Sequence, residues 1–134
     1  MNAFIVELPN QPGELARITE AIASKGIDLT GFSGVTCGTS GTVALLTNDE
    51  AGTRKVLREI GVPTRELEVV PASIETKPGS LASAVRRLAD AGVNIEAAMA
   101  IGMSGDKVNV AFATSDATAA RAALGGSAPA AASR

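Results

Sequence analysis

Apolar and polar positions alternate at the start of the chain and then change to a helical spacing. Residues 3–8 alternate between apolar and more polar positions, which predicts a strand with one face more buried than the other. Leu15, Ile18 and Ile22 then recur at intervals of three and four, which predicts an amphipathic helix. Gly26 follows the last of them, where a helix is expected to end.

The pattern continues to residue 70 with further elements of both kinds. It predicts a strand that opens at Ile27 and Leu29, a hairpin turn at 38–41, a strand at 42–47, a helix at 50–60 and a strand at 64–70. The order strand-helix-strand-strand-helix-strand is typical of an α+β unit of the ferredoxin-like (βαββαβ) kind. In that arrangement the helices cover one face of an antiparallel sheet.

The same pattern occurs a second time. Pro12-Gly13-Glu14-Leu15 is echoed by Pro78-Gly79-Ser80-Leu81, and 78 − 12 gives an offset of 66 residues. The offset also aligns Gly26 with Gly92, and it aligns Leu46 with Phe112 without a gap. A register kept over this length indicates an internal duplication. It predicts a helix at 80–91, strands at 93–101 and 108–114, and a helix at 117–124.

The duplication therefore predicts two small ferredoxin-like units packed side by side, 1–70 and 71–124. Pro71 marks the boundary, because a proline cannot donate to a strand ladder. Residues 125–134 are mostly alanine, glycine, serine and proline, and we expect them to be poorly ordered or loosely docked. The second unit is accordingly expected to lack a last strand of its own.

Composition narrows the range of functions. The net charge is −2, with 12 basic and 14 acidic residues, and three Phe stand without any Tyr or Trp. No basic stripe or aromatic platform is present, so nucleic acid is not an expected partner. Histidine is absent and Cys37 is the only cysteine, which excludes histidine-based nucleophile pairs and the ordinary zinc sites. We expect no cofactor and no metal.

No apolar run is long enough to span a bilayer, and no basic segment precedes an apolar core at the start. The expected setting is therefore cytoplasmic, without a membrane partner.

The two Pro-Gly corners carry a family resemblance. A strand, then Asn10-Gln11-Pro12-Gly13-Glu14-Leu15, then a helix that closes at Gly26-Ile27-Asp28-Leu29 resembles an ACT domain. The second copy, with Thr76-Lys77-Pro78-Gly79-Ser80-Leu81 and Gly92-Val93-Asn94-Ile95, resembles another. The likeness covers residues 1 to about 124 and is greatest to small free-standing tandem ACT proteins. It implies a regulatory module that binds an amino acid and has no enzyme attached.

The resemblance also implies a site, in the cleft between the first loop of one unit and the second strand of a neighbouring unit. Carried over by position, the ligand-binding residues are Asn10, Gln11, Pro12, Gly13, Glu14, Leu15 and Asp28 in the first copy, and Thr76, Lys77, Pro78, Gly79, Ser80, Leu81 and Asn94 in the second. The family often has an acid or Asn where Thr76 stands. The first corner is therefore the favoured working site, or the two sites differ in affinity.

Physical chemistry supports binding at these corners independently. The first amides of a helix lack partners within the helix and favour an anion such as a carboxylate. Gly13 and Gly79 have no Cβ, so a ligand can approach the backbone. The alternative is a purely structural role, in which Asn10 or Thr76 caps the helix and the glycine only makes the turn.

Three functions remain open. The first is a non-catalytic amino-acid sensor, expected as a homodimer and with a biosynthetic enzyme or a regulator as partner. The second is a dimerisation or docking module without a ligand. The third, more remote, is an acylphosphatase-like enzyme. Such phosphatases hold phosphate with an arginine in the first loop, and neither loop here has one, because Lys77 is a poor substitute for a bidentate donor.

Overall fold

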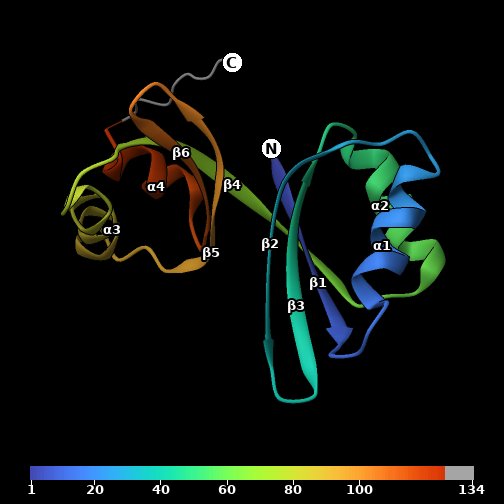
Figure 1. Cartoon of the computed structure of the whole chain (residues 1–134). Helices are drawn as coiled ribbons and strands as arrows, with labels where there is room; N and C mark the ends of the chain where they lie inside the picture. Colours follow the sequence, from blue (N-terminus) through green and yellow to red (C-terminus); the bar gives the residue numbers. More distant parts are fainter. Residues whose placement is uncertain (126–134) are drawn as a thin grey trace. The chain divides into compact units, whose positions relative to one another are not determined.

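The computed structural model describes residues 1–125. They form six antiparallel strands and four helices, so the predicted α+β class is confirmed (Figure 1). The chain divides into two compact units, one of residues 2–67 and one of Met1 with the chain from Glu68 onward. The predicted tail, and with it the predicted lack of a last strand, lies outside the described residues except for Gly125.

The unit of residues 2–67 contains a sheet with the strand order β2-β3-β1 and two helices. Its elements are β1 (Asn2–Pro9), α1 (Glu14–Ala23), β2 (Leu29–Cys37), β3 (Ser40–Thr47) and α2 (Glu50–Ile60). The turn between β2 and β3 is Gly38 and Thr39, within the predicted range 38–41.

The unit from Glu68 onward contains a sheet with the order β4-β6-β5 and two helices. Its elements are β4 (Thr64–Glu75), which begins in the first unit, α3 (Ser80–Asp90), β5 (Ile95–Ser104), β6 (Lys107–Thr114) and α4 (Ala117–Ala123). The strand predicted at 64–70 is too short, because β4 continues through Pro71, which stands opposite Ala111 of β6. The missing N–H of one proline therefore does not end the strand.

Each unit has its own apolar core between the helices and one face of the sheet. In the first unit, alternate residues of β1 and β3 meet α1 and α2 at Phe4, Val6, Leu8, Ile18, Ile22, Ile27, Val43, Leu45, Val56 and Leu57. In the second, β4 and β6 meet α3 and α4 at Val70, Ile74, Ala84, Leu88, Val93, Val110, Phe112, Ala120 and Leu124. The buried residues recur every second position in the strands and every third or fourth position in the helices, as the sequence pattern predicted.

The internal duplication contains one insertion, so the prediction of a gapless register is wrong. Leu45 stands opposite Phe4, and Phe112 stands opposite Val70. Since 70 − 4 = 66 and 112 − 45 = 67, Phe112 corresponds to Leu45 and not to Leu46. The register of β5 against β6 shifts between Ala100 and Gly102. This β-bulge adds one residue, and the offset is 67 after it.

The helix that follows each hairpin is tied to β4 by an arginine. Arg54 of α2 donates to both carboxylate oxygens of Glu66, with Nη2 at 2.7 Å from Oε1. Arg121 of α4, which corresponds to Arg54 because 121 − 54 = 67, donates to Glu68. The hydrogen bond from Arg54 lowers the pKa of Glu66 below its ordinary value, with a further contribution from the Asn2 amide. The hydrogen bond from Arg121 lowers the pKa of Glu68 in the same way.

The lowered pKa of Glu66 predicts a pH-dependent contribution to stability. A carboxylate with a depressed folded pKa stabilises the fold above its unfolded value of 4.5, and this contribution is lost as the pH falls through the lower folded pKa. Glu66→Gln should therefore reduce the fall in unfolding free energy between roughly pH 5 and pH 3. Urea unfolding at a series of pH values measures this. Glu59→Gln, on the exposed side of α2, is the matched control, and an unchanged pH profile for Glu66→Gln would contradict the prediction.

Candidate functional site

The two Pro-Gly corners have the same backbone geometry. Gly13 and Gly79 precede their helices with φ, ψ of 90°, −11° and 89°, −12°. This is the left-handed region, which residues with a Cβ rarely adopt. A Cβ at either position would meet no atom within 4 Å, so backbone conformation and not space explains the glycine. Each corner therefore turns a strand into a helix at a position that favours glycine.

Backbone hydrogen bonds at the corners also correspond. The N–H of Asn10 donates to Thr39 at 2.9 Å, and that of Thr76 donates to Asp106 at 2.9 Å. The N–H groups of Glu14 and Ser80 reach the carbonyls three residues earlier only at 3.4 Å and 3.3 Å. The strand end and the hairpin turn thus hold each loop in place.

No side chain caps α1 or α3, so the predicted capping role of Asn10 and Thr76 is not observed. The Asn10 amide instead donates to the carbonyl of Gly38 at 2.9 Å, in the β2–β3 turn. By contrast, α2 and α4 begin at Asp49 and Asp116, whose carboxylates accept from the helix at 2.9 Å and 3.0 Å. The two helices that follow Pro-Gly corners are therefore the two whose first amides lack a side-chain acceptor within residues 1–125.

Asp28 and Asn94 do not lie at the corner of their own unit. The Asp28 N–H donates to Asn48 at 3.0 Å, and the Asn94 N–H donates to Ser115 at 3.1 Å. In the first unit, Leu29 pairs with Thr47 and Cys37 pairs with Ser40, so Asp28 is separated from the corner by the length of β2. Eight residues of strand span roughly 26 Å. Within one unit, the structure does not bring these residues together with the loop.

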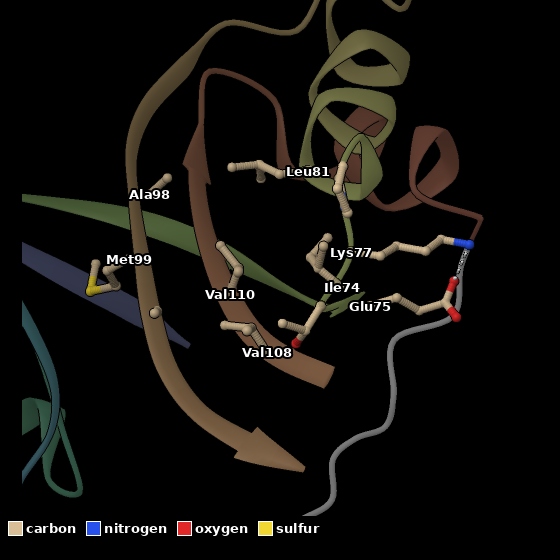
Figure 2. Close-up of a pocket in the computed structure, with 11 residues that line it drawn as sticks. Ile74, Glu75, Lys77, Leu81, Ala98, Met99, Val108 and Val110 are labelled. Atoms are coloured by element: carbon tan, nitrogen blue, oxygen red, sulfur yellow. Dashed lines mark ion pairs between the residues drawn. The ribbon is translucent and has the colours of Figure 1, made fainter. Parts of the chain in front are cut away.

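A cavity of about 630 Å³ adjoins the second corner, on the face of the sheet that carries the helices (Figure 2). Its wall contains Ile74, Glu75, Thr76, Lys77, Pro78, Leu81, Ala98, Met99, Ala100, Val108 and Val110. Four predicted site residues, Thr76, Lys77, Pro78 and Leu81, thus line it. Gly79 and Ser80 instead line a neighbouring hollow that shares Lys77 and Pro78.

Small side chains of β5 make room for this cavity. Ala98 stands opposite Phe112, and Ala100 stands opposite Val110, so both lie on the core-facing side of the sheet. Since 98 − 66 = 32, the corresponding residue of the first unit is Phe32, which pairs with Leu45 and has 64% of its surface exposed. The two corners share a backbone, but a large ring stands in the first unit where the second has a methyl group.

Sequence reasoning missed the strand residues of the cavity wall, namely Ile74, Met99, Ala100, Val108, Val110 and Ala98. The signal that could identify them is cross-strand pairing of small against large residues, which requires the β5–β6 register. The charged residues of the wall are Glu75 and Lys77, whose ends meet at 3.5 Å (Figure 2). The rest of the cavity wall is mainly apolar.

The fold is similar to those of several solved structures. Protein BT0572 from Bacteroides thetaiotaomicron is similar, with a TM-score of 0.78 and 24% identity over 92% of this chain and 85% of that one. The ligand-free regulatory subunit of aspartate kinase from Thermus thermophilus is also similar, with a TM-score of 0.66 and 22% identity over 92% of this chain and 87% of that one. The regulatory subunit of aspartate kinase from Thermus flavus has a TM-score of 0.63 and 23% identity over 92% of this chain and 88% of that one. The predicted likeness to ACT domains is thus confirmed at the level of the fold.

No protein-family model matches the sequence, and no curated protein matches it. Among residues 1–125, no helix is both long and apolar enough to cross a bilayer. The same residues contain no group of three or more metal-binding side chains.

The left-handed backbone at Gly79 predicts that replacing this glycine destabilises the fold. Gly79→Ala should lower the unfolding free energy by about 1–2 kcal/mol, because the Cβ strains the backbone at φ 89° while meeting no neighbour. Chemical denaturation measures the loss. Ser80→Ala is the control, since its side chain forms no cap and its removal should change the value little. Equal stability of Gly79→Ala and the parent protein would show that the corner is not strained.

Proposed function

We propose that this chain is a non-catalytic regulatory module that binds an amino acid with an apolar side chain at the second Pro-Gly corner. The observation that carries the proposal is the apolar cavity beside an uncapped helix N-terminus. The corner offers partly positive amides, and the cavity offers an apolar surface next to them. An α-amino acid has a carboxylate and a side chain that match these two features.

The carboxylate is placed at the first turn of α3. Helix amides in the first turn have no partner within the helix and carry partial positive charge. Leu81 belongs both to this turn and to the cavity wall, so an anion on the amides lies next to the apolar space. The Thr76 hydroxyl and the Glu75 carboxylate lie in the same wall and are acceptors for the ammonium group.

The side chain of the ligand is placed against Ala98, Ala100, Val108 and Val110. Burying a leucine-sized side chain contributes about 1.5–3 kcal/mol, which corresponds to a preference over glycine of roughly tenfold to a hundredfold. A charged side chain placed against these four apolar residues would gain no partner from them. The module should therefore select aliphatic amino acids. We place the ligand at the second corner and not at the first, because the first unit has Phe32 at the strand position of Ala98.

A regulatory role is supported by the neighbours in fold, several of which are described as regulatory subunits of aspartate kinase. By analogy, we expect a partner enzyme or regulator and a homodimer. A ligand that binds one conformation or assembly better than another stabilises it by mass action. Catalysis is not proposed, since the sequence has no histidine and the charged residues of the cavity wall are the Glu75–Lys77 pair.

The cavity predicts how the affinity for an amino acid changes when Ala98 and Phe32 are each replaced by the residue of the other unit. Ala98→Phe places the first unit's ring in the cavity and should weaken binding of the best-bound aliphatic amino acid at least about tenfold. Isothermal titration of the full chain with the twenty amino acids measures this. Phe32→Ala is the matched change at the other corner and should leave the affinity unchanged.

Absence of binding by all twenty amino acids would remove the sensor proposal and favour the dimerisation or docking module. Equal loss of affinity in Phe32→Ala and Ala98→Phe would place the ligand elsewhere. In both variants, circular dichroism and the thermal midpoint without ligand confirm that the fold is retained.

A further inference from the structure

A second, polar hollow of about 490 Å³ lies between the edge of β4 and α3 in the unit from Glu68 onward. Its wall is mainly polar, whereas that of the first cavity is mainly apolar, although both walls include Ile74, Glu75, Lys77 and Pro78. Its wall also contains Ser73, Gly79, Ser80, Ser83, Arg87 and Lys107. The hydroxyl and cationic groups of this hollow have no role in the proposed binding of an amino acid.

Three elements bring the cationic and hydroxyl groups to this hollow. Ser80, Ser83 and Arg87 follow the spacing i, i+3, i+7 and therefore form one stripe along α3. Lys77 comes from the loop before the helix, and Lys107 begins β6, opposite Glu75 of β4. The stripe on the helix thus faces cations from the loop and the sheet.

The hollow has a net positive charge. It contains three cations, Lys77, Arg87 and Lys107, and one acid, Glu75, so its formal charge is 3 − 1 = +2. Lys77 pairs with Glu75 at 3.5 Å. Within residues 1–125, neither Arg87 nor Lys107 forms an ion pair. Two uncompensated cations are therefore left in a hollow of a chain whose net charge is −2.

The first unit shows that the fold does not require these cations. With the offset of 66, Lys77 and Arg87 correspond to Gln11 and Ala21. With the offset of 67 beyond the bulge, Lys107 corresponds to Ser40. All three positions are neutral in one copy and cationic in the other, while the corner backbone is the same in both.

We infer that this hollow, which adjoins the proposed amino-acid site and shares part of its wall, is an anion site for a small molecule that carries a phosphate group. A phosphate ester has a charge of about −1.5 to −2 at neutral pH and three acceptor oxygens, which matches a formal charge of +2 and three serine hydroxyls. Arg87 can donate two parallel hydrogen bonds to phosphate. The volume falls within the range of about 300–1,000 Å³ that small-ligand sites have. Inorganic phosphate and the phosphate of an organic ester offer the same group.

The test is isothermal titration of the full chain with pyrophosphate, inorganic phosphate and citrate at low ionic strength. We expect saturable binding of pyrophosphate that weakens as salt is added, because the cations are exposed. Arg87→Gln and Lys107→Gln should each weaken it about tenfold, the effect of losing one charge-assisted hydrogen bond. Glu75→Gln should strengthen it, since the acid that offsets the cations is removed.

Arg86→Gln is the matched control, because Arg86 lies on the same helix but pairs with Asp90 at 3.6 Å and does not line the hollow. Its affinity for pyrophosphate should stay within about twofold of the parent protein. If Arg86→Gln lost as much pyrophosphate affinity as Arg87→Gln, binding would depend only on general charge attraction, and the proposed site would be wrong. Absence of saturable pyrophosphate binding up to about 10 mM, or tighter binding of citrate, would overturn it as well.

The phosphate site and the amino-acid site are tested separately by two variants. Ala98→Phe should leave pyrophosphate binding unchanged, and Arg87→Gln should leave binding of an aliphatic amino acid unchanged. Binding of pyrophosphate without binding of any amino acid would support this site alone, and the reverse result would refute it while leaving the sensor proposal in place.

Discussion

The structure depends on a backbone constraint, the left-handed glycine that joins a strand to a helix. At φ near 90° the chain reverses without a side-chain cap, at Gly13 and again at Gly79. The first turns of α1 and α3 have no side-chain acceptor, whereas Asp49 and Asp116 each accept from one amide of their helices. The corner that turns the strand into the helix therefore also leaves room for the proposed carboxylate, because an aspartate cap would satisfy an amide of that turn.

The two copies show what this constraint fixes and what it leaves open. Backbone hydrogen bonds at the two corners correspond one to one, yet the side chains around them differ. Phe32 in one copy stands where Ala98 lines the apolar cavity in the other. Gln11 and Lys77 differ likewise in charge. The two copies thus share the backbone of the corner and differ in the side chains around it, so the chemistry of each corner depends on its neighbours on the adjacent strands.

Much of the fold could be predicted from the sequence, because its signals are local. Alternation predicted β1, helical spacing predicted α1 and α3, and glycine marked the ends of elements near Gly26 and Gly92. The register of the hairpins could not be predicted this way. Leu45 and Leu46 are both aliphatic and both buried, so an offset of 66 and one of 67 fit the sequence equally well there. Only the bulge after Ala100 decides between them. The cavity was missed for the same reason, since its wall is defined by pairs across β5 and β6 that no local pattern contains.

The position of the bulge gives the insertion a structural rationale. An extra residue within a paired strand would move every following side chain to the opposite face, which would turn Met103 away from the face of Val108. A bulge at Ile101, with Gly102 at φ 152° next to it, absorbs the extra residue locally. Ala98 and Ala100 before it keep the face of their counterparts Phe32 and Gly34, and Met103 after it stands opposite Val108 on that face again. Lys107 then follows the turn on the strand opposite Glu75. The insertion has therefore left the core register intact, and the differences between the two corners lie in side chains on an equivalent frame.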